Sequence, residues 1–453
     1  MTTIRQLFGG DMRQYGMIGA LIAILLFFQW KTGGLVFTPT NFINLVQGNT
    51  YVLILALGML LVIVAGHIDL SVGSVAAFVG IIVAMAYSQW GWPEWAAILL
   101  GLCLGAIVGA WQGFWVAFVG VPAFVVTLSG WMLFRGLNQW VGASLTVPSG
   151  PIMQYLGGGF LPDIMPDVIP FNLPTMILAA IGVLAVAWRE LSKRAKARKY
   201  DLETVPVWVS IARVVVLSAV ILSVMWIFAS GNVGTSIPVS GLIVIVLVLF
   251  YSFLSTKTIL GRGVYAVGGN RQAAALAGVS LRKTNFFVMF NNALLASVAA
   301  VVFIGRAHAS GPQDGNLWEL DAIAAVFIGG AAVTGGVGTV MGTMVGALVM
   351  ASLNNGLSLM GIGIDRTQVI KGAVLLAAVA LDVYSKQQGK RSVIGMFQNA
   401  WRRNRGEPGT SPALVTSAED ASLANSATET PTSTVPVQDV ARPGTSDPLG
   451  RKQ

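Results

Sequence analysis

The chain has 453 residues, of which 55% are hydrophobic and only 10% are charged, and its formal net charge is +9. A typical soluble domain has roughly 25% charged residues, so this composition excludes an ordinary water-soluble globule. The basic residues lie in short segments between apolar blocks, which is the pattern that orients membrane proteins. We therefore expect membrane lipid as the surroundings and no nucleic acid as a partner. Cys103 is the single cysteine, which excludes an intrachain disulfide and a cysteine-based metal site.

Apolar segments long enough to cross a bilayer follow one another along the chain. About 20 apolar residues cross about 30 Å of hydrocarbon. Blocks that are apolar on every face predict helices and exclude the alternation of a barrel. We expect an all-α polytopic membrane protein, a bundle of ten to twelve transmembrane helices, with the first one retained and not cleaved as a signal peptide. The expected spans are 17–37, 43–65, 70–88, 95–118, 121–141, 174–188, 207–229, 238–255, 285–305, 319–335, 339–358 and 368–384.

Basic loops set the expected orientation. Two loops, near 189–206 and 256–284, are densely basic and are expected in the cytoplasm. Six spans precede the first loop and two separate the loops, so both termini are expected in the cytoplasm too. Residues 1–16 then form a cytoplasmic N-terminus and 17–385 the transmembrane domain. A basic juxtamembrane segment (386–405) and a disordered cytoplasmic tail (406–453) follow.

Glycines recur every fourth residue in two of the apolar segments. Such spacing lets two helices approach closely. Static packing is one interpretation, and a sliding surface for a helix that moves during transport is the other; the spacing leaves both open. Gly329-Gly330 and Gly335-Gly336 are expected to interrupt a helix, because each glycine weakens it by roughly 1 kcal/mol relative to alanine. The stripes are Gly101, Gly105, Gly109 and Gly113, and Gly338, Gly342 and Gly346.

Asp69 lies between two apolar spans, where a charge at membrane depth costs at least about 2.5 kcal/mol. It must be paired, solvated or capping. One interpretation is a structural N-cap of the next helix; the other is a contact at the pathway or the coupling face. Polar residues within apolar spans are pathway candidates, although small polar residues also join helices. The candidate translocation or structural residues are Gly66, Asp69, Ser71, Gly73, Asn291, Asn292, Asn354 and Asn355.

Two further segments predict contact surfaces. The Pro- and Gly-rich segment 146–174 is expected to be an outer loop. Four charged residues that lie close together in sequence predict an outer docking surface for a partner: Arg306, Asp314, Glu319 and Asp321. The alternative is a loop that is merely solvated. Only two histidines occur, without His-x-x-x-His spacing, so no metal site is expected.

Residues 261–279 predict a short helix in the second basic loop. Asn270, after two glycines, can cap a helix of about two turns, and Gly278 can end it in a left-handed conformation. Gly268-Gly269 does not form a dinucleotide fingerprint, because no strand precedes it and the spacing Gly-x-Gly-x-x-Gly is absent. A compact, alanine-rich helix between two spans is suited to a groove of another protein.

Three motifs in this order resemble the permease subunits of bacterial ribose- and xylose-type ABC sugar importers. They are Gly66 to Gly73, Tyr265 to Gly278, and Glu319 to Ala325 with the two glycine pairs that follow. The long basic insertion near 189–199 and the runs 123–128 and 351–356 resemble xylose permeases most. His67 stands where the first motif has glycine, and Ala275 stands where the second commonly has arginine.

The resemblance implies a homodimer that carries a monosaccharide, xylose or a related pentose or hexose, across the cytoplasmic (inner) membrane. It implies an ATP-binding subunit below and an extracytoplasmic sugar-binding protein above. No catalytic residue and no cofactor are expected in this chain, since ATP and Mg²⁺ would bind to the partner ATPase. The residues implied to couple to the ATPase are Gly268, Gly269, Asn270, Arg271, Ala273, Ala274, Leu276, Ala277 and Gly278.

Two other classes compete with this hypothesis. An ion-coupled secondary transporter of a small neutral solute is expected to carry ionisable residues at the middle of the membrane, and most spans have none. Sodium coupling through backbone carbonyls stays open. A membrane-embedded enzyme is not supported, because the sequence has no His-Glu-x-x-His, Gly-x-Ser-x-Gly or Gly-x-x-x-x-Gly-Lys-Ser/Thr motif.

Overall fold

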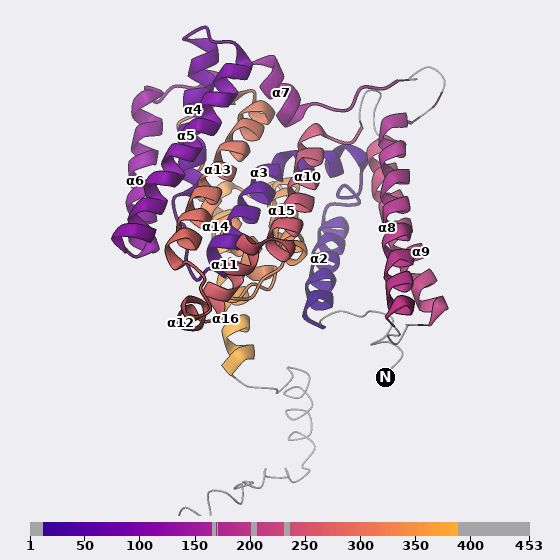
Figure 1. Ribbon diagram of the computed structural model, residues 1–453. Coiled ribbons are helices and arrows are strands. Elements are labelled where there is room, and N and C mark those ends of the chain that lie inside the picture. The colour runs from indigo at the N-terminus through magenta and orange to yellow at the C-terminus, as the bar shows by residue number, and fades with distance from the viewer. Residues whose placement is uncertain (1–11, 165–168, 170, 201–205, 231–235, 388–453) are drawn as a thin grey trace, which may run out of the picture. The chain divides into compact units, whose positions relative to one another are not determined.

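A computed structural model describes residues 12–164, 169, 171–200, 206–230 and 236–387 (Figure 1). Residues 1–11 of the expected N-terminus, most of the expected basic segment 386–405 and the expected tail 406–453 lie outside the described residues. The described chain is a helical bundle with one two-stranded sheet, which confirms the all-α polytopic class.

The elements of the first half alternate apolar helices with short connections. Prolines precede or open several of them, because proline fits the start of a helix. In order they are α2 (Met12–Lys31), α3 (Pro39–Val64), α4 (Val72–Ser88), α5 (Glu94–Phe114), the π-helix η1 (Trp115–Val119), α6 (Ala123–Val141), β1 (Val147–Pro148), α7 (Pro151–Gly158) and α8 (Leu173–Lys199).

The second half contains the short helices α11 and α12 between long ones. In order the elements are α9 (Val207–Ala229), α10 (Val239–Lys257), α11 (Ile259–Gly269), α12 (Arg271–Leu276), α13 (Leu281–Ala307), β2 (Ala309–Ser310), α14 (Trp318–Ile328), α15 (Val340–Leu359) and α16 (Ile364–Gln387). β1 and β2 pair antiparallel, with Val147 opposite Ser310.

Every expected span coincides with a helix, and seven described helices are long and apolar enough to cross a membrane. α14 is the exception in length: 11 residues rise only about 16 Å, half of a crossing. It ends at the expected glycine break, since Gly330, Gly335 and Gly336 all have positive φ. The expected span 319–335 is therefore wrong as a full crossing.

Two expected loops contain regular structure instead. α8 continues to Lys199 through the basic segment 189–199, because Lys, Arg, Ala, Leu and Glu all favour a helix beyond the apolar part. The expected outer loop 146–174 contains β1 and α7. Glu94 accepts hydrogen bonds from the N–H groups of Ile152 (2.6 Å) and Met153 (3.2 Å), which fixes the start of α7.

α3 and α13 form the centre of the bundle (Figure 1). In the apolar 18-residue stretch of each helix, 83% of α3 and 72% of α13 is buried. α3 packs against α13, α10, α14 and α15, while α13 packs also against α4, α5 and α7. These two helices, and the segments that join them to their neighbours, therefore position the residues of the candidate site.

The predicted glycine stripes lie at helix contacts. A Cβ at Gly109 on α5 would lie 2.7 Å from the carbonyl oxygen of Phe290 on α13, and one at Gly105 would lie 2.6 Å from Ser297 Cβ. Gly342 and Gly346 on α15 meet Gly329 and Ala325 of α14 in the same way. The close packing that this spacing predicts is present at both interfaces.

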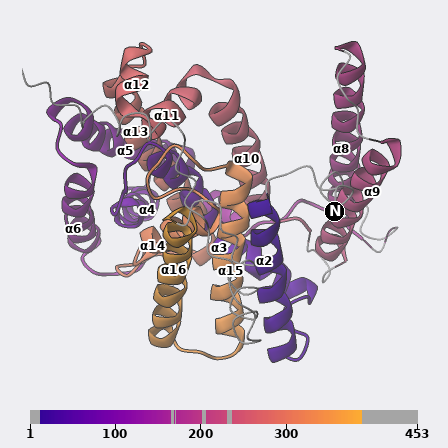
Figure 2. The ribbon, with the colours of Figure 1, turned by 90° about the horizontal axis from the view of Figure 1, so that it is seen from below.

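α8 and α9 form a hairpin at the side of the bundle (Figures 1 and 2). Only 11% and 6% of their apolar windows are buried. The hairpin is attached near the end where the chain enters and leaves it. There Phe160 bridges Pro238, the Ile237 N–H donates to Thr175 Oγ1 at 3.1 Å, and the Phe42 and Phe228 rings lie 5.4 Å apart.

Candidate functional site

Asp69 lies inside the bundle, in a segment that runs back from the end of α3 to the start of α4. It is 1% exposed. Its Oδ1 accepts hydrogen bonds from the N–H and the hydroxyl of Ser71, both at 2.7 Å, and its Oδ2 accepts one from Asn292 on α13, also at 2.7 Å. Gln112 on α5 donates to Ser71 Oγ at 2.7 Å. These hydrogen bonds satisfy the carboxylate, as a buried carboxylate requires.

The predicted capping role is present in altered form. Ser71, and not Asp69, is the residue that directly precedes α4, and the Asp69 carboxylate accepts the N–H of Ser71. Asn292, a candidate because of its polarity within an apolar span, is a hydrogen-bond donor to Asp69. Gln112 is not among the predicted residues, although a single glutamine in an apolar helix indicates a polar contact in the same way.

Gly73 and Glu319 join the first and third sequence motifs. A Cβ at Gly73 would overlap Glu319 Oε2 and the carbonyl oxygen of Gly315. Glycine is therefore required for the starts of α4 and α14 to meet. Glu319 is 4% exposed, and its carboxylate lies against the N-terminal turn of α4, where the helix dipole favours negative charge.

The predicted outer docking surface is divided. Glu319 and Asp321 are only 4% and 2% exposed, so the prediction that they form an outer surface is wrong for these two residues. The loop before α14 enters the bundle and carries both residues into it. Arg306 and Asp314 are half-buried. Burial raises the pKa of Asp314, while hydrogen bonds from the Gly311 N–H (2.8 Å) and Ser310 Oγ (3.4 Å) oppose the rise.

Asp321 forms an ion pair within the bundle. Lys371 Nζ on α16 lies 2.7 Å from its Oδ1 and 2.9 Å from its Oδ2. The Asp321 side chain is 3% exposed and the Lys371 side chain is 18% exposed. Asn354 on α15 extends the group, since its Nδ2 lies 3.5 Å from Asp321 Oδ2 and 3.1 Å from Asn49 Oδ1 on α3.

A polar cavity of about 700 Å³ is lined in part by Lys371. It is bounded by α3, by the ends of α15 and α16 that face each other, and by the loop before α14. We call it the amide cavity, after the side chains that dominate it. Among its lining residues are Asn49, Tyr51, Gln313, Asn316, Asn354 and Asn355.

The amide cavity lies at the end of the bundle opposite α12. Gln47 on α3 donates to the carbonyl of Gly158 in α7 at 3.0 Å, and Figure 1 shows α7 and α12 at opposite ends. Asn41 and Asn355 exchange hydrogen bonds of 3.0 and 3.1 Å beside it. Amide groups donate and accept at once, so this lining suits a neutral molecule with several hydroxyl groups.

Asn291 does not line the amide cavity. It accepts a hydrogen bond from the Tyr251 hydroxyl and joins α10 to α13. The asparagines predicted as pathway candidates thus divide: Asn354 and Asn355 line the cavity, while Asn291 and Asn292 connect helices.

The short helix predicted after Gly269 is present as α12. Asn270 Oδ1 accepts the N–H of Ala273 at 2.9 Å, and Gly278 has φ +83°. Both features confirm the local structure expected from the sequence. Leu276 is 91% exposed at the tip, whereas Ala274 is buried at 4%. α11, which precedes it, was expected as a loop.

Three glycine-containing segments meet beside α12. A Cβ at Gly268 would overlap the carbonyl oxygen of Val64, and the N–H of Gly336 donates to that same oxygen at 2.8 Å. Gly66 lies within 3.1 Å of where a Cβ of Gly335 would be. We call this contact of 64–66, 268–269 and 335–336 the glycine junction. It connects α12 to the Asp69 segment and to the turn between α14 and α15.

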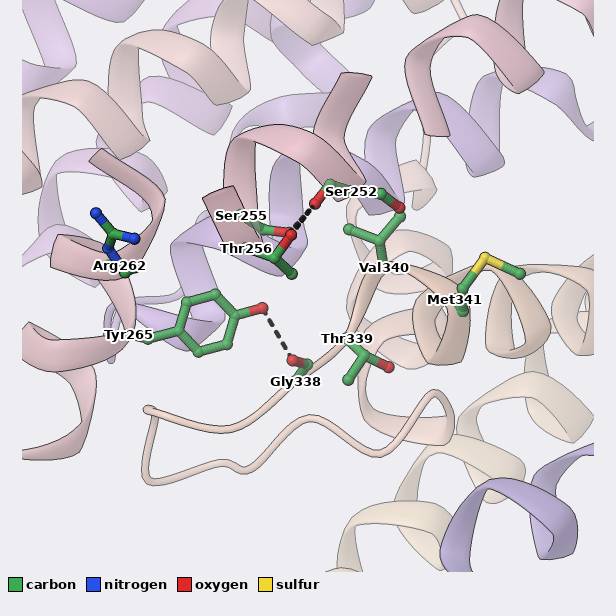
Figure 3. Close-up of a pocket in the computed structure, with 9 residues that line it drawn as sticks. All are labelled: Ser252, Ser255, Thr256, Arg262, Tyr265, Gly338, Thr339, Val340 and Met341. Carbon is green, nitrogen blue, oxygen red and sulfur yellow. Dashed lines mark hydrogen bonds between the residues drawn. The ribbon is translucent and has the colours of Figure 1, made fainter. Parts of the chain in front are cut away.

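A second cavity, of about 520 Å³, lies beside the glycine junction (Figure 3). Its walls come from the end of α10, from α11 and from the start of α15. The Tyr265 hydroxyl donates to the carbonyl of Gly338 at 2.9 Å, and Thr339 Oγ1 accepts the N–H of Gly342 at 3.0 Å, which starts α15. These contacts hold the turn before α15 against α11.

The fold and these sites define a polytopic helical membrane permease, with a polar cavity at one end and an exposed short helix at the other. The glycine junction connects the short helix to the Asp69 segment and to the turn before α15. The chain belongs to the family described as branched-chain amino acid transport system / permease component, which matches residues 41–379. It is thus a permease component, a transport subunit of a bacterial type, and the resemblance seen in its motifs is confirmed.

Known relatives are similar over most of the chain. The xylose transport system permease protein XylH of Escherichia coli K12 is 36% identical over 379 residues, which cover 83% of this chain and 93% of XylH. XylH of Haemophilus influenzae is 36% identical over 83% of this chain and 98% of its own. The ribose import permease protein RbsC of E. coli K12 is 32% identical over 76% of this chain and 86% of its own. No solved structure matches the chain.

Proposed function

We propose that this chain is the membrane-spanning subunit of an ATP-driven importer for a monosaccharide, xylose or a related pentose or hexose. The observation that carries the proposal is the amide cavity in a chain whose relatives are named for xylose and ribose transport. The family description names branched-chain amino acids, which carry a charge at each end. Lys371 lines the amide cavity and its charge is balanced by Asp321, so the lining favours a neutral solute.

The α12 end faces the cytoplasm in this proposal, and the amide cavity faces outward. The positive-inside rule supports this orientation, because Arg262, Arg271 and Lys283 lie in or beside α11 and α12. The basic C-terminal end of α8 lies at the same end of the molecule as α12 (Figure 1). The N- and C-termini are then cytoplasmic and the membrane is the inner membrane. An extracytoplasmic sugar-binding protein would release its sugar into the amide cavity, close to Arg306 and Asp314.

α12 is the proposed contact with the ATP-binding subunit. Its tip residue Leu276 is exposed enough to enter a groove of a partner. Movement of α12 would reach Gly268 and pass through the glycine junction to the Asp69 segment and to α15. ATP and Mg²⁺ bind to the partner, and this chain contributes the path. Two copies of it form the permease, as in the family that it resembles.

ATP-driven uptake is the decisive test. Proteoliposomes that hold this chain, the ATPase and the binding protein are loaded with ATP or with its non-hydrolysable analogue, and uptake of labelled xylose, ribose and leucine is measured. We expect uptake of a sugar with ATP alone. Uptake that follows an imposed proton or sodium gradient and ignores ATP would identify a secondary transporter, and uptake of leucine alone would overturn the substrate class.

The α12 assignment has a test of its own. Leu276→Asp places a charge on an exposed tip, so the fold stays intact while binding of purified ATPase and ATP-driven uptake fall at least tenfold. Leu145→Asp is the matched control, because Leu145 is 64% exposed in the turn before β1 at the other end. Ala274→Asp does not serve this purpose, since Ala274 is buried and an unpaired buried charge disturbs α12 itself. Normal ATPase binding and uptake in Leu276→Asp would remove the assignment.

A further inference from the structure

The ion pair of Asp321 and Lys371 marks the boundary between two cavities. Lys371 and Leu317 line both the amide cavity and a smaller cavity of about 50 Å³, to which Asp321 also contributes. Leu320, Ala324 and Leu375 supply apolar walls to the smaller cavity. Gln368 also lines both cavities, so Lys371 and Gln368 form the boundary between them, and Asp321 holds Lys371 from the side of the smaller cavity.

Stability alone does not account for a charged pair at this depth. Taking two charges out of water costs free energy that their attraction often fails to regain, and well-packed apolar residues of similar volume commonly replace such pairs without loss. Leu317 beside the pair has φ +62°, a left-handed conformation that branched residues rarely adopt. Strained residues of this kind cluster at functional sites.

Lys371 retains unused hydrogen-bonding capacity, and it lines the amide cavity. The Lys371 ammonium has three N–H donors, and the two carboxylate oxygens of Asp321 lie 2.7 and 2.9 Å away, so one donor is left. Asn354 adds an amide whose Nδ2 is shared between Asn49 and Asp321. Two adjacent hydroxyl groups of a sugar match this set, since one hydroxyl can accept from Lys371 while its neighbour donates to Asn354 Oδ1, and both residues line the amide cavity.

An aromatic wall lies in the same cavity. Tyr51 lines the amide cavity, and its ring centroid lies 4.2 Å from that of Trp318 and 5.4 Å from that of Phe303. These ring contacts fix the Tyr51 side chain. An aromatic residue held beside charged and amide groups offers an apolar surface to the C–H face of a sugar ring.

We infer that Lys371, held by Asp321, forms with Asn354 a sugar subsite within the permease, which binds adjacent hydroxyl groups before the solute passes Leu317. This inference rests on the proposed function and extends it, because it gives the permease a recognition step separate from that of the binding protein. The subsite binds and orients the solute and takes part in no covalent step.

Binding of sugar to the full chain alone tests the subsite. The permease is placed in lipid nanodiscs without partners, and D-xylose, D-ribose and the deoxy sugar 2-deoxy-D-ribose are titrated with detection by saturation-transfer NMR, which suits weak binding. We expect saturable binding of at least one of the two intact sugars and at least fivefold weaker binding of the deoxy sugar. The absence of saturable binding by either intact sugar would overturn the inference.

Paired variants separate recognition from folding. Asp321→Leu with Lys371→Met replaces both charges at similar volume, and we expect normal thermal unfolding but at least tenfold weaker sugar binding. Tyr251→Phe with Asn291→Leu is the control, because it removes another buried polar pair that lies outside the amide cavity. Wild-type binding in the folded Asp321–Lys371 double variant would overturn the inference.

Uptake measurements keep the two hypotheses apart. ATP-driven sugar uptake by the wild-type importer, together with an unchanged KM in the folded double variant, would refute the subsite and leave the proposed function standing. Absence of ATP-driven uptake in the wild type would refute the proposed function instead, whatever the isolated permease binds.

Discussion

Gly73 lies where the start of α4 meets the start of α14. Because a Cβ there would overlap Glu319 Oε2 and the Gly315 carbonyl, Gly73→Ala forces the two helices apart. We expect it to lower the free energy of unfolding by about 1–3 kcal/mol. Gly136→Ala is the control, since nothing lies within 4 Å of its Cβ position on α6 and alanine favours the helix by up to about 1 kcal/mol. Denaturant titration of both purified variants measures the difference, and equal stability would contradict the contact.

The bond between Asp69 and Asn292 is the other residue-scale test. Both side chains are buried, so removing either leaves a polar partner unsatisfied. Asp69→Ala and Asn292→Ala should each destabilise the protein, while the double variant should cost less than the sum. We expect a coupling energy of about 1–3 kcal/mol from a double-mutant cycle. Additive effects would show that the two residues act independently.

The sequence indicated that Asp69 needs partners but not which ones. Asn292 lies 223 positions further on, and no local pattern connects the two residues. The same holds for Asp321, whose neighbourhood in sequence indicated an exposed outer segment. Its partner Lys371 lies on another helix, and only the tertiary packing reveals the burial of both.

α12 depends on its first residue. Asn270→Ala removes the side-chain acceptor for the Ala273 N–H, which should cost about 1 kcal/mol in this short helix. We expect faster amide hydrogen exchange in residues 271–278 and weaker binding of the ATPase, without a change in the rest of the bundle. Asn270→Ser is the control, because serine caps a helix nearly as well as asparagine. Unchanged exchange in Asn270→Ala would show that partner contacts, not the cap, hold α12.

Local chemistry predicted some elements better than others. Long apolar runs predicted the helices, and the pattern from Asn270 to Gly278 predicted α12, because caps and left-handed glycines act over a few residues. The sequence does not predict the extension of α8, because its apolar run ends before the helix does, although helix-forming residues continue to Lys199. The short length of α14 was missed because apolar residues around a glycine turn resemble a continuous span.

The α8–α9 hairpin is attached to the bundle near the point where the chain enters and leaves it. The chain enters the hairpin at Phe160 and leaves it at Pro238, and these two residues bridge each other. Replacing residues 161–237 with a short Gly-Ser linker should therefore leave the remaining bundle folded, with a melting temperature within a few degrees of the wild type. Thermal unfolding and ATP-driven uptake measure the result. Loss of the folded bundle would show that the hairpin supports the core.

The distance in sequence between Asp69 and Asn292 sets an order of events during synthesis. Translation at about 5–20 residues per second separates the two residues by roughly 10–45 s. Throughout that interval α3 and α4 are in or near the membrane while the donor from α13 does not yet exist. Until then Ser71 supplies the hydrogen bonds to Asp69 Oδ1, and Oδ2 gains its bond from Asn292 only when α13 has been made.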